Sequence, residues 1–536
     1  MRESGRIRVG ALIILACAAL AGALLIPGSA RTAEDAPVEP GSRAVLFVAN
    51  NWDGTADVVD PQTLKSLERF NVVPDLQERL TEIYTDPVRT GYFLAIRELI
   101  GEGHDQFADD MFSSHDGRFV YISRPSLADV VGMDLRTKQI VWRFTMDGQR
   151  SDHMAISPDG TRLLVSDSTA RKVHVLNAAD GRKVGEFESG DSPHENNYSA
   201  DGALIFHASI GMVYTPGDAP TFDSAKGDRY FQIVDARTYK VLKRLDIGKI
   251  LADNGFPGQS SAVRPMAISP DEKTVYLQLS FLHGFVEFDL GTEKPRRIVE
   301  LPIAEKTKTI PREQYLLDSA HHGLAINPDG TKLCAAGTMS DYAAIVSTRD
   351  FSVKTFDGID KPYWSTNSGD GRYCFVSASG SDEVVVIDYA AQKEVARIGV
   401  GDHPQRMRMG SIRREYLGGD SPAAPKPRRA AAKLKVLRAG VRGGKLTMRL
   451  QMTSRARGSL RATYIADRMR TRFTIPIPVA AARRAGARGS TVTWTGRHRL
   501  SARQRRARTG VLVLSYRGSA AVRGDGARAR VRRSPR

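Results

Sequence analysis

Five histidines are the first candidates for chemistry, because they come from well-separated parts of the chain. Imidazole nitrogens are common ligands of zinc, copper and iron. One hypothesis is therefore a transition-metal site with His153, His194 and His322 as ligands. The other two histidines of the set are His321 and His403. Because the sequence has no HExxH or CxxCH motif, a metal site requires that the fold bring distant residues together.

Six candidate residues occupy one position of a repeated unit, five residues before a Ser-Pro-Asp-Gly-like turn. Few of the side chains at this position favour burial, so their convergence on one axis predicts a polar funnel that binds something. In six units the position holds Asp109, Asp152, His194, Arg264, His322 and Tyr363. Neighbouring residues add Asp110, His153, Glu195, His321 and Trp364, and a final segment adds His403 and Arg406.

Three interpretations of this funnel stay open at the level of sequence. The first is the metal site. The second is a metal-free site, in which Arg264 and the histidines hold an anion or a sugar-like molecule against Tyr363 and Trp364. A lactonase-like hydrolase would be a special case of this metal-free site. His194 or His322 would then act as general base, and Arg264 would stabilise the developing oxyanion. In the third interpretation, these side chains only form hydrogen bonds with the backbone of the turns. The residues therefore leave open whether the protein is an enzyme.

The repeated unit defines the elements that must position these residues. Its turn motif begins at Ser114, Ser157, Ser199, Ser269, Asn327 and Ser368. A β-branched or aromatic run follows each turn, and a second run ends in an acidic or amide residue and another turn. Four strands per unit make a propeller blade. The pattern predicts an all-β fold: a seven-bladed β-propeller over residues 43–412, in which the strand at 403–410 completes the first blade. The apolar spacing within about 75–110 predicts a helical insertion.

Three segments carry a resemblance to a known repeat family. They are FVANNWDGTADVVD (47–60), MAISPDGTRLLVSDSTARKVHVLN (154–177) and VSASGSDEVVVIDYAAQKEVARIGVGDHPQ (376–405). These segments resemble the YVTN-type repeat of surface-layer-like and lactonase-like propellers. The resemblance implies the propeller fold, but not one activity, because propellers host binding, scaffolding, hydrolysis and redox chemistry.

The first 30 residues predict export. Arg2, Arg6 and Arg8 precede an apolar run over 9–26 and then small residues, which is typical of a signal peptide or an N-terminal anchor. Residues 31–42 are expected to be a spacer. The protein is therefore predicted to be extracytoplasmic, either secreted or anchored in the cell envelope.

Two cysteines follow the predicted signal segment. Cys334 lies four residues after the glycine of a DG turn, and Cys374 lies three residues after the next one. This offset points the two side chains to opposite strand faces. We expect both to be buried free thiols.

The C-terminal part of the chain is strongly basic. Residues 426–536 contain 31 lysines and arginines and two acidic residues. We expect a linker at 413–432, a small basic β-sandwich resembling an immunoglobulin domain at 433–520, and a disordered basic tail at 521–536. Arginines such as Arg449, Arg461 and Arg472 alternate with apolar residues, so one face is predicted to be cationic.

These observations predict an exported, envelope-associated monomer that binds a small molecule or a protein at its propeller channel. The basic domain is expected to tether it to an anionic cell-wall polymer or a membrane surface. Nucleic acid is not expected as a specific partner. The rival hypothesis is a metal-dependent oxidoreductase with copper, zinc or iron, or a lactonase-like hydrolase, using the channel histidines.

Overall fold

The computed structural model describes two parts of the chain. The first part covers residues 39–213, 220–315, 317 and 319–417. The second covers 430–431, 434–442, 445–453, 459–466, 469–476, 491–500, 509–519 and 522–533. The predicted export signal at 1–30 and residues 418–429 of the predicted linker lie outside the described residues. Among the described helices, none has the length and apolar character needed to cross a bilayer.

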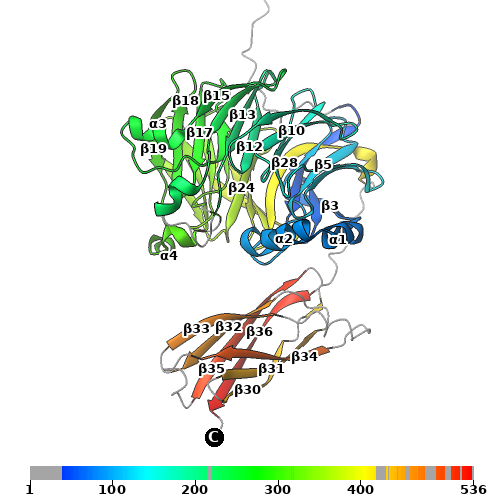
Figure 1. Cartoon of the computed structure of the whole chain (residues 1–536), viewed down its shortest axis with the longest axis vertical. Helices are drawn as coiled ribbons and strands as arrows, with labels where there is room; N and C mark the ends of the chain where they lie inside the picture. Colours follow the sequence, from blue (N-terminus) through cyan, green and yellow to red (C-terminus); the bar gives the residue numbers. More distant parts are fainter. Residues whose placement is uncertain are drawn as a thin grey trace, which may run out of the picture.

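Residues 42–413 form a seven-bladed β-propeller of seven four-stranded antiparallel sheets (Figure 1). From inner to outer strand, blade 1 consists of β28 (Pro404–Arg413), β1 (Ser42–Asn50), β2 (Thr55–Asp60) and β3 (Lys65–Asn71). Blade 2 consists of β4 (Met111–Ser113), β5 (Phe119–Arg124), β6 (Asp129–Asp134) and β7 (Gln139–Thr145). Blade 3 consists of β8 (Ser151–Ile156), β9 (Arg162–Asp167), β10 (Lys172–Asn177) and β11 (Lys183–Glu188). Blades 4 and 5 are β12 (Pro193–Tyr198), β13 (Leu204–Ser209), β14 (Phe231–Asp235), β15 (Val241–Leu245); and β16 (Val263–Ile268), β17 (Thr274–Leu279), β18 (Gly284–Asp289), β19 (Lys294–Glu300). Blades 6 and 7 are β20 (Leu324–Ile326), β21 (Lys332–Gly337), β22 (Tyr342–Ser347), β23 (Val353–Asp357); and β24 (Pro362–Asn367), β25 (Tyr373–Ala378), β26 (Glu383–Asp388), β27 (Lys393–Gly399).

The last propeller strand closes the ring, as the sequence predicts. Strand β28 pairs with β1 in antiparallel register, from Ser42 opposite Arg413 to Phe47 opposite Arg408. Both strands would otherwise expose unpaired edges. Because β28 is also the innermost strand of blade 1, residues from the end of the propeller lie beside the channel.

The repeated turn motif explains the sharp change of direction between the first two strands of a blade. In blade 3, the Ser157 hydroxyl donates to Asp159 at 2.5 Å and accepts from the backbone N–H of Arg162 at 2.9 Å. Asp159 accepts from the backbone N–H of Thr161. Gly160 has a φ of 72°, in the left-handed region that favours glycine. The Ser, Asp and Gly of the motif therefore each have a defined role in the turn.

The segment between blades 1 and 2 contains the helices α1 (Leu76–Thr85) and α2 (Pro87–Ala95) and the π-helical turn η2 (Ile96–Ile100). The Asp86 side chain caps α2 by accepting from two backbone N–H groups. Arg124, which is fully buried, bonds Asp75 at 2.6 Å and Asp129 at 2.7 Å. This ion pair holds the start of the helical segment against blade 2. The remaining helical turns of the propeller are η3 (Pro125–Leu127), η4 (Pro220–Ala225), α3 (Ile247–Asp253), α4 (Glu305–Lys308), η5 (Arg312–Gln314) and η7 (Arg414–Tyr416).

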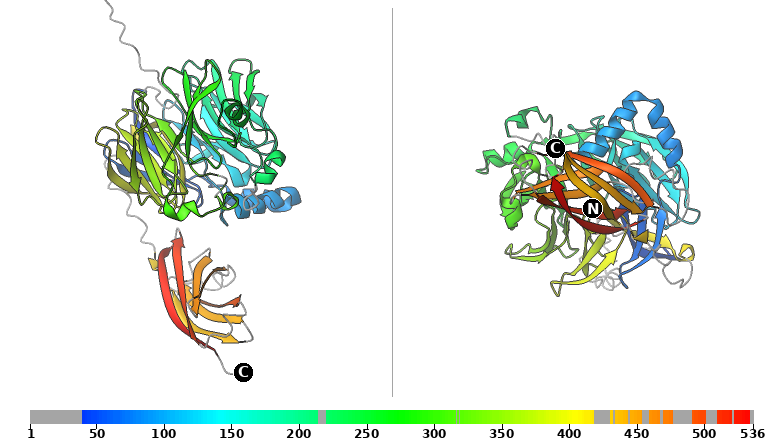
Figure 2. Two further views of the ribbon diagram at one scale, coloured as in Figure 1. Left: turned by 90° about the vertical axis from the view of Figure 1, so that its left-hand side faces the viewer. Right: turned by 90° about the horizontal axis from the view of Figure 1, so that it is seen from below.

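The C-terminal domain is a separate β-structure (Figure 2). Its strands are β29 (Ala430–Ala431), β30 (Lys435–Arg442), β31 (Lys445–Thr453), β32 (Ser459–Ala466), β33 (Met469–Pro476), β34 (Thr491–Arg499), β35 (Thr509–Ser519) and β36 (Val522–Arg533). They are hydrogen-bonded in one sheet, in the order β33-β32-β35-β36-β30-β31-β34, with β29 beside β36. Met448 of β31, Tyr464 of β32 and Leu512 of β35 belong to one buried cluster. The C-terminal domain is therefore a β-structure around one core, as the sequence predicts, and its strands form one continuous hydrogen-bonded sheet.

The prediction of a disordered tail at 521–536 is wrong for most of that segment. Residues Val522–Arg533 form β36, which pairs antiparallel with β35 over most of its length and parallel with β29 and β30. The sequence ARARVRR alternates arginine with small or apolar residues, which suits a strand with one solvated face. The high charge and low complexity of the tail concealed this period.

The prediction of two free thiols is also wrong, because Cys334 and Cys374 form a disulfide. Cys334 lies on β21 of blade 6 and Cys374 on β25 of blade 7, and both are fully buried. The one-residue offset does point them to opposite faces of their strands. Since neighbouring blades pack face to face, opposite faces of adjacent blades meet. The offset is thus the condition for pairing.

This crosslink is expected to stabilise the propeller. The chain-entropy relation gives about 4 kcal/mol for the 40-residue separation of the two cysteines. Chemical unfolding should therefore show that reductant destabilises the wild type by several kcal/mol. The Cys334→Ala plus Cys374→Ala variant should not respond to reductant. Equal stability of the wild type with and without complete reduction would contradict the expectation.

Candidate functional site

A β-bulge near the start of the inner strand places the candidate residues in five of the seven blades. In β8 the register skips two residues opposite Ser166, and these residues are Asp152 and His153. A bulge interrupts the alternation of side chains and re-aims them. The same skip falls on His194 and Glu195, Arg264 and Pro265, Tyr363 and Trp364, and Gln405 and Arg406.

Three histidines from different blades converge at the channel axis. His153 lies on β8, His194 on β12, and His322 just before β20, and each is at most 4% exposed. One ligand atom from each lies within 4.8 Å of the other two. The ring centroids are 3.9 Å apart for His153 and His194, and 5.6 Å for His194 and His322. These are the three residues that the sequence analysis names as a ligand set.

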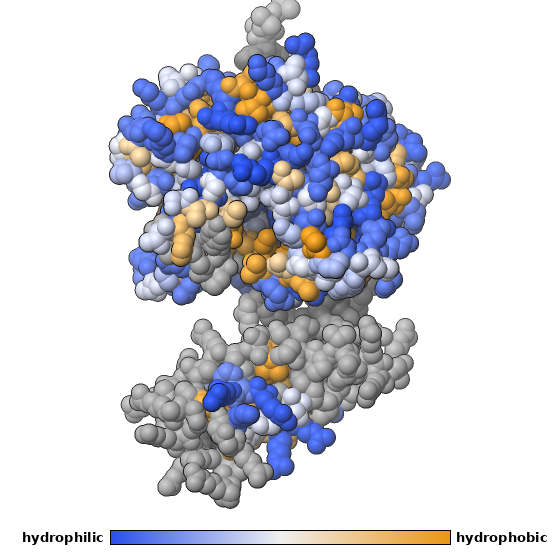
Figure 3. Space-filling view, in the orientation of Figure 1, coloured by the Kyte–Doolittle hydropathy of each residue, from blue (hydrophilic) through white to orange (hydrophobic). Residues whose placement is uncertain are grey.

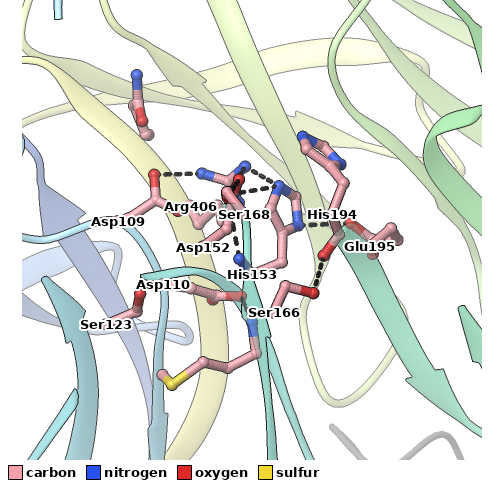
Figure 4. A network of polar contacts seen from close by, with 12 residues as sticks. Asp109, Asp110, Ser123, Asp152, His153, Ser166, Ser168, His194, Glu195 and Arg406 are labelled. Carbon is pink, nitrogen blue, oxygen red and sulfur yellow. Dashed lines mark hydrogen bonds and ion pairs between the residues drawn. The ribbon is translucent and has the colours of Figure 1, made fainter. Parts of the chain in front are cut away.

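The polar neighbours of His153 favour one tautomer of its ring (Figure 4). Arg406 contacts Nε2 of His153, and because a guanidinium can only donate, Nε2 is the acceptor. A neutral ring then carries its hydrogen on Nδ1. Nδ1 lies 2.6 Å from Oε2 of Glu195. Glu195 is thus placed to orient the ring.

Burial and nearby cations favour the neutral form of all three imidazoles. Burial lowers the pKa of His153 well below its usual range, and Arg406 and His194 add to the effect. The pKa of His194 is lowered by burial and by Arg264, and that of His322 by burial and by Arg406. Neutral imidazoles keep the lone pairs that a metal requires.

Buried carboxyl groups and arginines surround the histidines. Arg406 donates to Asp109 at 2.5 Å, and burial raises the pKa of Asp109 to about 7 although Arg406 opposes it. Burial also acts against ionisation of Asp152, but Arg150 and Arg406 outweigh it and lower its pKa. Asp152 contacts Arg150 and accepts from Ser168 at 2.9 Å. The positive charges near the histidines are therefore matched by carboxyl groups.

Three further predicted residues line the same centre. The ring of Tyr363 stacks on His322 at 4.2 Å, and the ring of Trp364 lies 5.7 Å from that of His153. Burial raises the pKa of Tyr363 to about 12. Arg264 donates to Ser280 at 3.0 Å and to the Leu317 carbonyl at 2.6 Å. This bonding directs its guanidinium toward the loop before β20.

Two predicted residues have their contacts elsewhere. Nε2 of His321 lies 3.2 Å from the Tyr342 hydroxyl, and its ring is 5.8 Å from that of His283. The neighbours His321 and His322 therefore serve different environments. The ring of His403 stacks on Trp52 at 3.6 Å, and Trp52 stacks on His104 at 3.9 Å.

Arg408, which was not among the residues predicted from the sequence, binds Asp110 through Nε at 2.9 Å and Nη2 at 3.0 Å. Its guanidinium lies between the rings of Phe112 and Trp364. The i, i+2 spacing from Arg406 on an inner strand was a signal that could have identified it. Arg150, by contrast, lies before the repeat position and carries no such signal.

The residues present fit a transition-metal ion. Within the described residues, no hydrogen-bond partner is found for Nδ1 of His194 or Nδ1 of His322. Three histidines with an open fourth position are a common zinc arrangement, and Glu195 beside His153 matches the carboxylate that usually orients such a ligand. A second group, Asp147, His174 and Glu186, lies away from the channel, and Lys183 already binds both of its carboxylates.

Burial of Glu195 has a consequence for stability. Burial raises the pKa of Glu195 to about 8, against the lowering effects of Arg408 and Arg406. The folded protein therefore holds a proton that the unfolded chain releases near its ordinary pKa of about 4.3. The stability contributed by this group is complete below that pH and is lost as the pH rises through about 8.

We expect Glu195→Gln to reduce this fall in stability with pH, because glutamine does not ionise. Release of one full proton on unfolding changes the free energy of unfolding by about 1.4 kcal/mol per pH unit. Urea unfolding of chelator-treated protein across mildly acidic to mildly alkaline pH tests this. Glu186→Gln, at an exposed site, is the control and should keep the wild-type slope. Identical slopes for Glu195→Gln and wild type would contradict the assignment.

Comparison with known proteins leaves the family open. No protein-family model and no curated protein sequence matches the chain. Among solved structures, the chain is similar to hydrazine synthase of Kuenenia stuttgartiensis, with 16% identity and a TM-score of 0.43 over 55% of this chain and 88% of that chain. This similarity carries no argument about activity. The assignment as a seven-bladed propeller rests on the strand pairing itself.

Proposed function

We propose that this protein is an exported, YVTN-like propeller that holds a transition-metal ion in its channel and is tethered by its basic domain to an anionic envelope surface. The ligands are His153, His194 and His322. The observation that carries the proposal is the convergence of three buried, neutral imidazoles from three blades. Zinc, copper and iron all suit such ligands.

The arrangement favours a metal over an anionic ligand at this centre. Arg406 and Arg150 contact Asp109 and Asp152, and Arg408 is bound by Asp110. Arg264 donates to Ser280 and to a backbone carbonyl. An incoming anion would have to compete with these bonds, whereas Nδ1 of His194 and Nδ1 of His322 have no partner among the described residues.

The chain's own residues would control the bound ion. If Glu195 orients Nδ1 of His153, a metal would bind Nε2 of the same ring. Arg406 donates to this Nε2 in the structure. Metal binding through Nε2 therefore requires that Arg406 shift toward Asp109 or Asp152. A bound ion would supply Lewis acidity, or electron transfer if it is copper or iron. The stacked Tyr363 and the ring of Trp364 would limit the access of water on one side.

Elemental analysis of tag-free protein tests the metal site. After incubation with zinc or copper and removal of excess metal, the wild type should retain one ion per chain. The His194→Ala plus His322→Ala variant should lose it. His321→Ala is a matched control, because His321 is equally buried and adjacent in sequence but contacts Tyr342 instead. Retention of the metal by the double variant, or equal loss from the control, would refute the proposed ligand set.

The basic domain supports a tethering role through the arrangement of its cations. On the adjacent strands β30, β31 and β34, Arg438 lies opposite Arg449, and Lys445 lies opposite Arg499. All four side chains are exposed, while Leu446 and Met448 point into the core. Like charges opposite each other on a sheet destabilise it unless a counterion neutralises them. The part of this domain coloured in Figure 3 is mainly hydrophilic.

We expect this cationic face to bind anionic surfaces. Replacing Lys445, Arg449, Arg497 and Arg499 by glutamine should weaken co-sedimentation with phosphatidylglycerol vesicles by more than about tenfold at low salt, since each cation near such a surface contributes about 1 kcal/mol. A control variant replaces four exposed propeller residues by glutamine and so changes the net charge equally. These residues are Arg182, Lys249, Lys273 and Arg297. Unchanged sedimentation of the first variant would argue against the tether.

A further inference from the structure

We propose that the channel contains a second binding site, on the side of the repeated turns, for a small uncharged molecule with an apolar body and a hydrogen-bond acceptor. A cavity of about 130 Å³ lies there. It is distinct from the histidine centre in position and in chemistry. Nothing in its construction depends on a metal.

Every blade contributes its inner strand to the wall of this cavity. Phe112 of β4, Ile156 of β8, Asn196 of β12, Met266 of β16, Leu324 of β20 and Thr366 of β24 line it, together with Arg408 of β28. The cavity therefore lies on the propeller axis. Pro270 and Pro328, which belong to the repeated turns, also line it. The opening is consequently on the turn side, away from the loops that lead into the histidine centre.

The inner end of the cavity is formed by Trp364 and Glu195. The Trp364 ring lies 5.7 Å from His153 and 6.4 Å from His322, and neither histidine lines the cavity. Trp364 is 4% exposed, and its Nε1–H has no hydrogen-bond partner within the described part of the chain. A buried indole N–H without an acceptor costs free energy that a ligand oxygen can recover.

The charges around the cavity favour an uncharged occupant. Arg408 is held by both oxygens of Asp110 and lies between the Phe112 and Trp364 rings. Glu195 contacts His153, and Glu272 at the opening accepts from the backbone N–H of Ala200. An anion would meet the carboxylate of Glu272, and a cation would meet Arg408. Ile156, Met266 and Leu324 provide apolar surface for the body of the ligand.

The size of the cavity limits the class of ligand further. One water molecule needs about 10–15 Å³ of cavity volume. The cavity of about 130 Å³ therefore holds on the order of ten waters, or a molecule with about as many non-hydrogen atoms. Small aromatic or cyclic amides, lactones and alcohols meet these requirements. Benzamide is a suitable probe, because its carbonyl can accept from Trp364 and its ring can contact the apolar wall.

Calorimetric titration of metal-free full-length protein with benzamide tests the site. We expect saturable binding in the millimolar range or tighter. Ala325→Leu should weaken it at least about tenfold, because Ala325 lines the cavity and is only partly buried. Trp364→Phe keeps an aromatic ring but removes the N–H donor, and should weaken binding about three- to tenfold. Benzoate, of the same shape but charged, should bind about tenfold more weakly than benzamide.

Ala391→Leu, on an exposed turn of blade 7, is the matched control and should bind benzamide like the wild type. Thermal unfolding of each variant checks that it is folded. Metal retention measured on Ala325→Leu should be unchanged, so failure of the cavity and failure of the metal site are distinguishable. No saturable binding of benzamide, binding unaffected by Ala325→Leu, or tighter binding of benzoate would each overturn the proposal.

Discussion

A two-residue β-bulge at one position of the inner strands is the constraint on which the channel depends. It leaves the rest of each blade paired, while two consecutive residues face one residue of the next strand. That single residue often holds the neighbouring backbone: Ser377 accepts from the backbone N–H of Trp364 at 2.9 Å, and Gln278 exchanges two hydrogen bonds with Gly323. The bulges are therefore fixed parts of the structure, and charged or aromatic residues can occupy them without weakening the sheets.

Charge compensation is the second condition for this interior. Several arginines lie within or beside the channel, and burying a guanidinium without a partner would cost several kcal/mol. Asp109, Asp110 and Asp152 supply those partners. The histidines stay neutral as a result of burial and of these nearby cations. The burial and the cations that make carboxylate partners necessary thus also keep imidazole lone pairs available.

The sequence predicted the features that follow from the repeat and missed those that follow from contacts between units. The alignment five residues before each turn identified His194 and His322, and His153 at the next position, because equivalent positions in a ring meet at its axis. It also placed His321 in the funnel, although the structure directs that side chain elsewhere, since the direction of adjacent side chains depends on the local backbone. It also could not pair Cys334 with Cys374, because that pairing is a contact between two blades. Arg528 and its neighbours on β36 show a third limit: charge dominated the composition and hid a strand period.

The closing strand links the two halves of the channel. On β28, Arg406 contacts His153 and Asp109, whereas Arg408, two residues later, lines the cavity on the other side of Trp364. Each half therefore takes one cation from the same strand. Because β28 reaches its place only by pairing with β1, neither half is complete until the ring closes. A ligand in either half contacts residues that only the closed ring positions, so its binding free energy also stabilises ring closure.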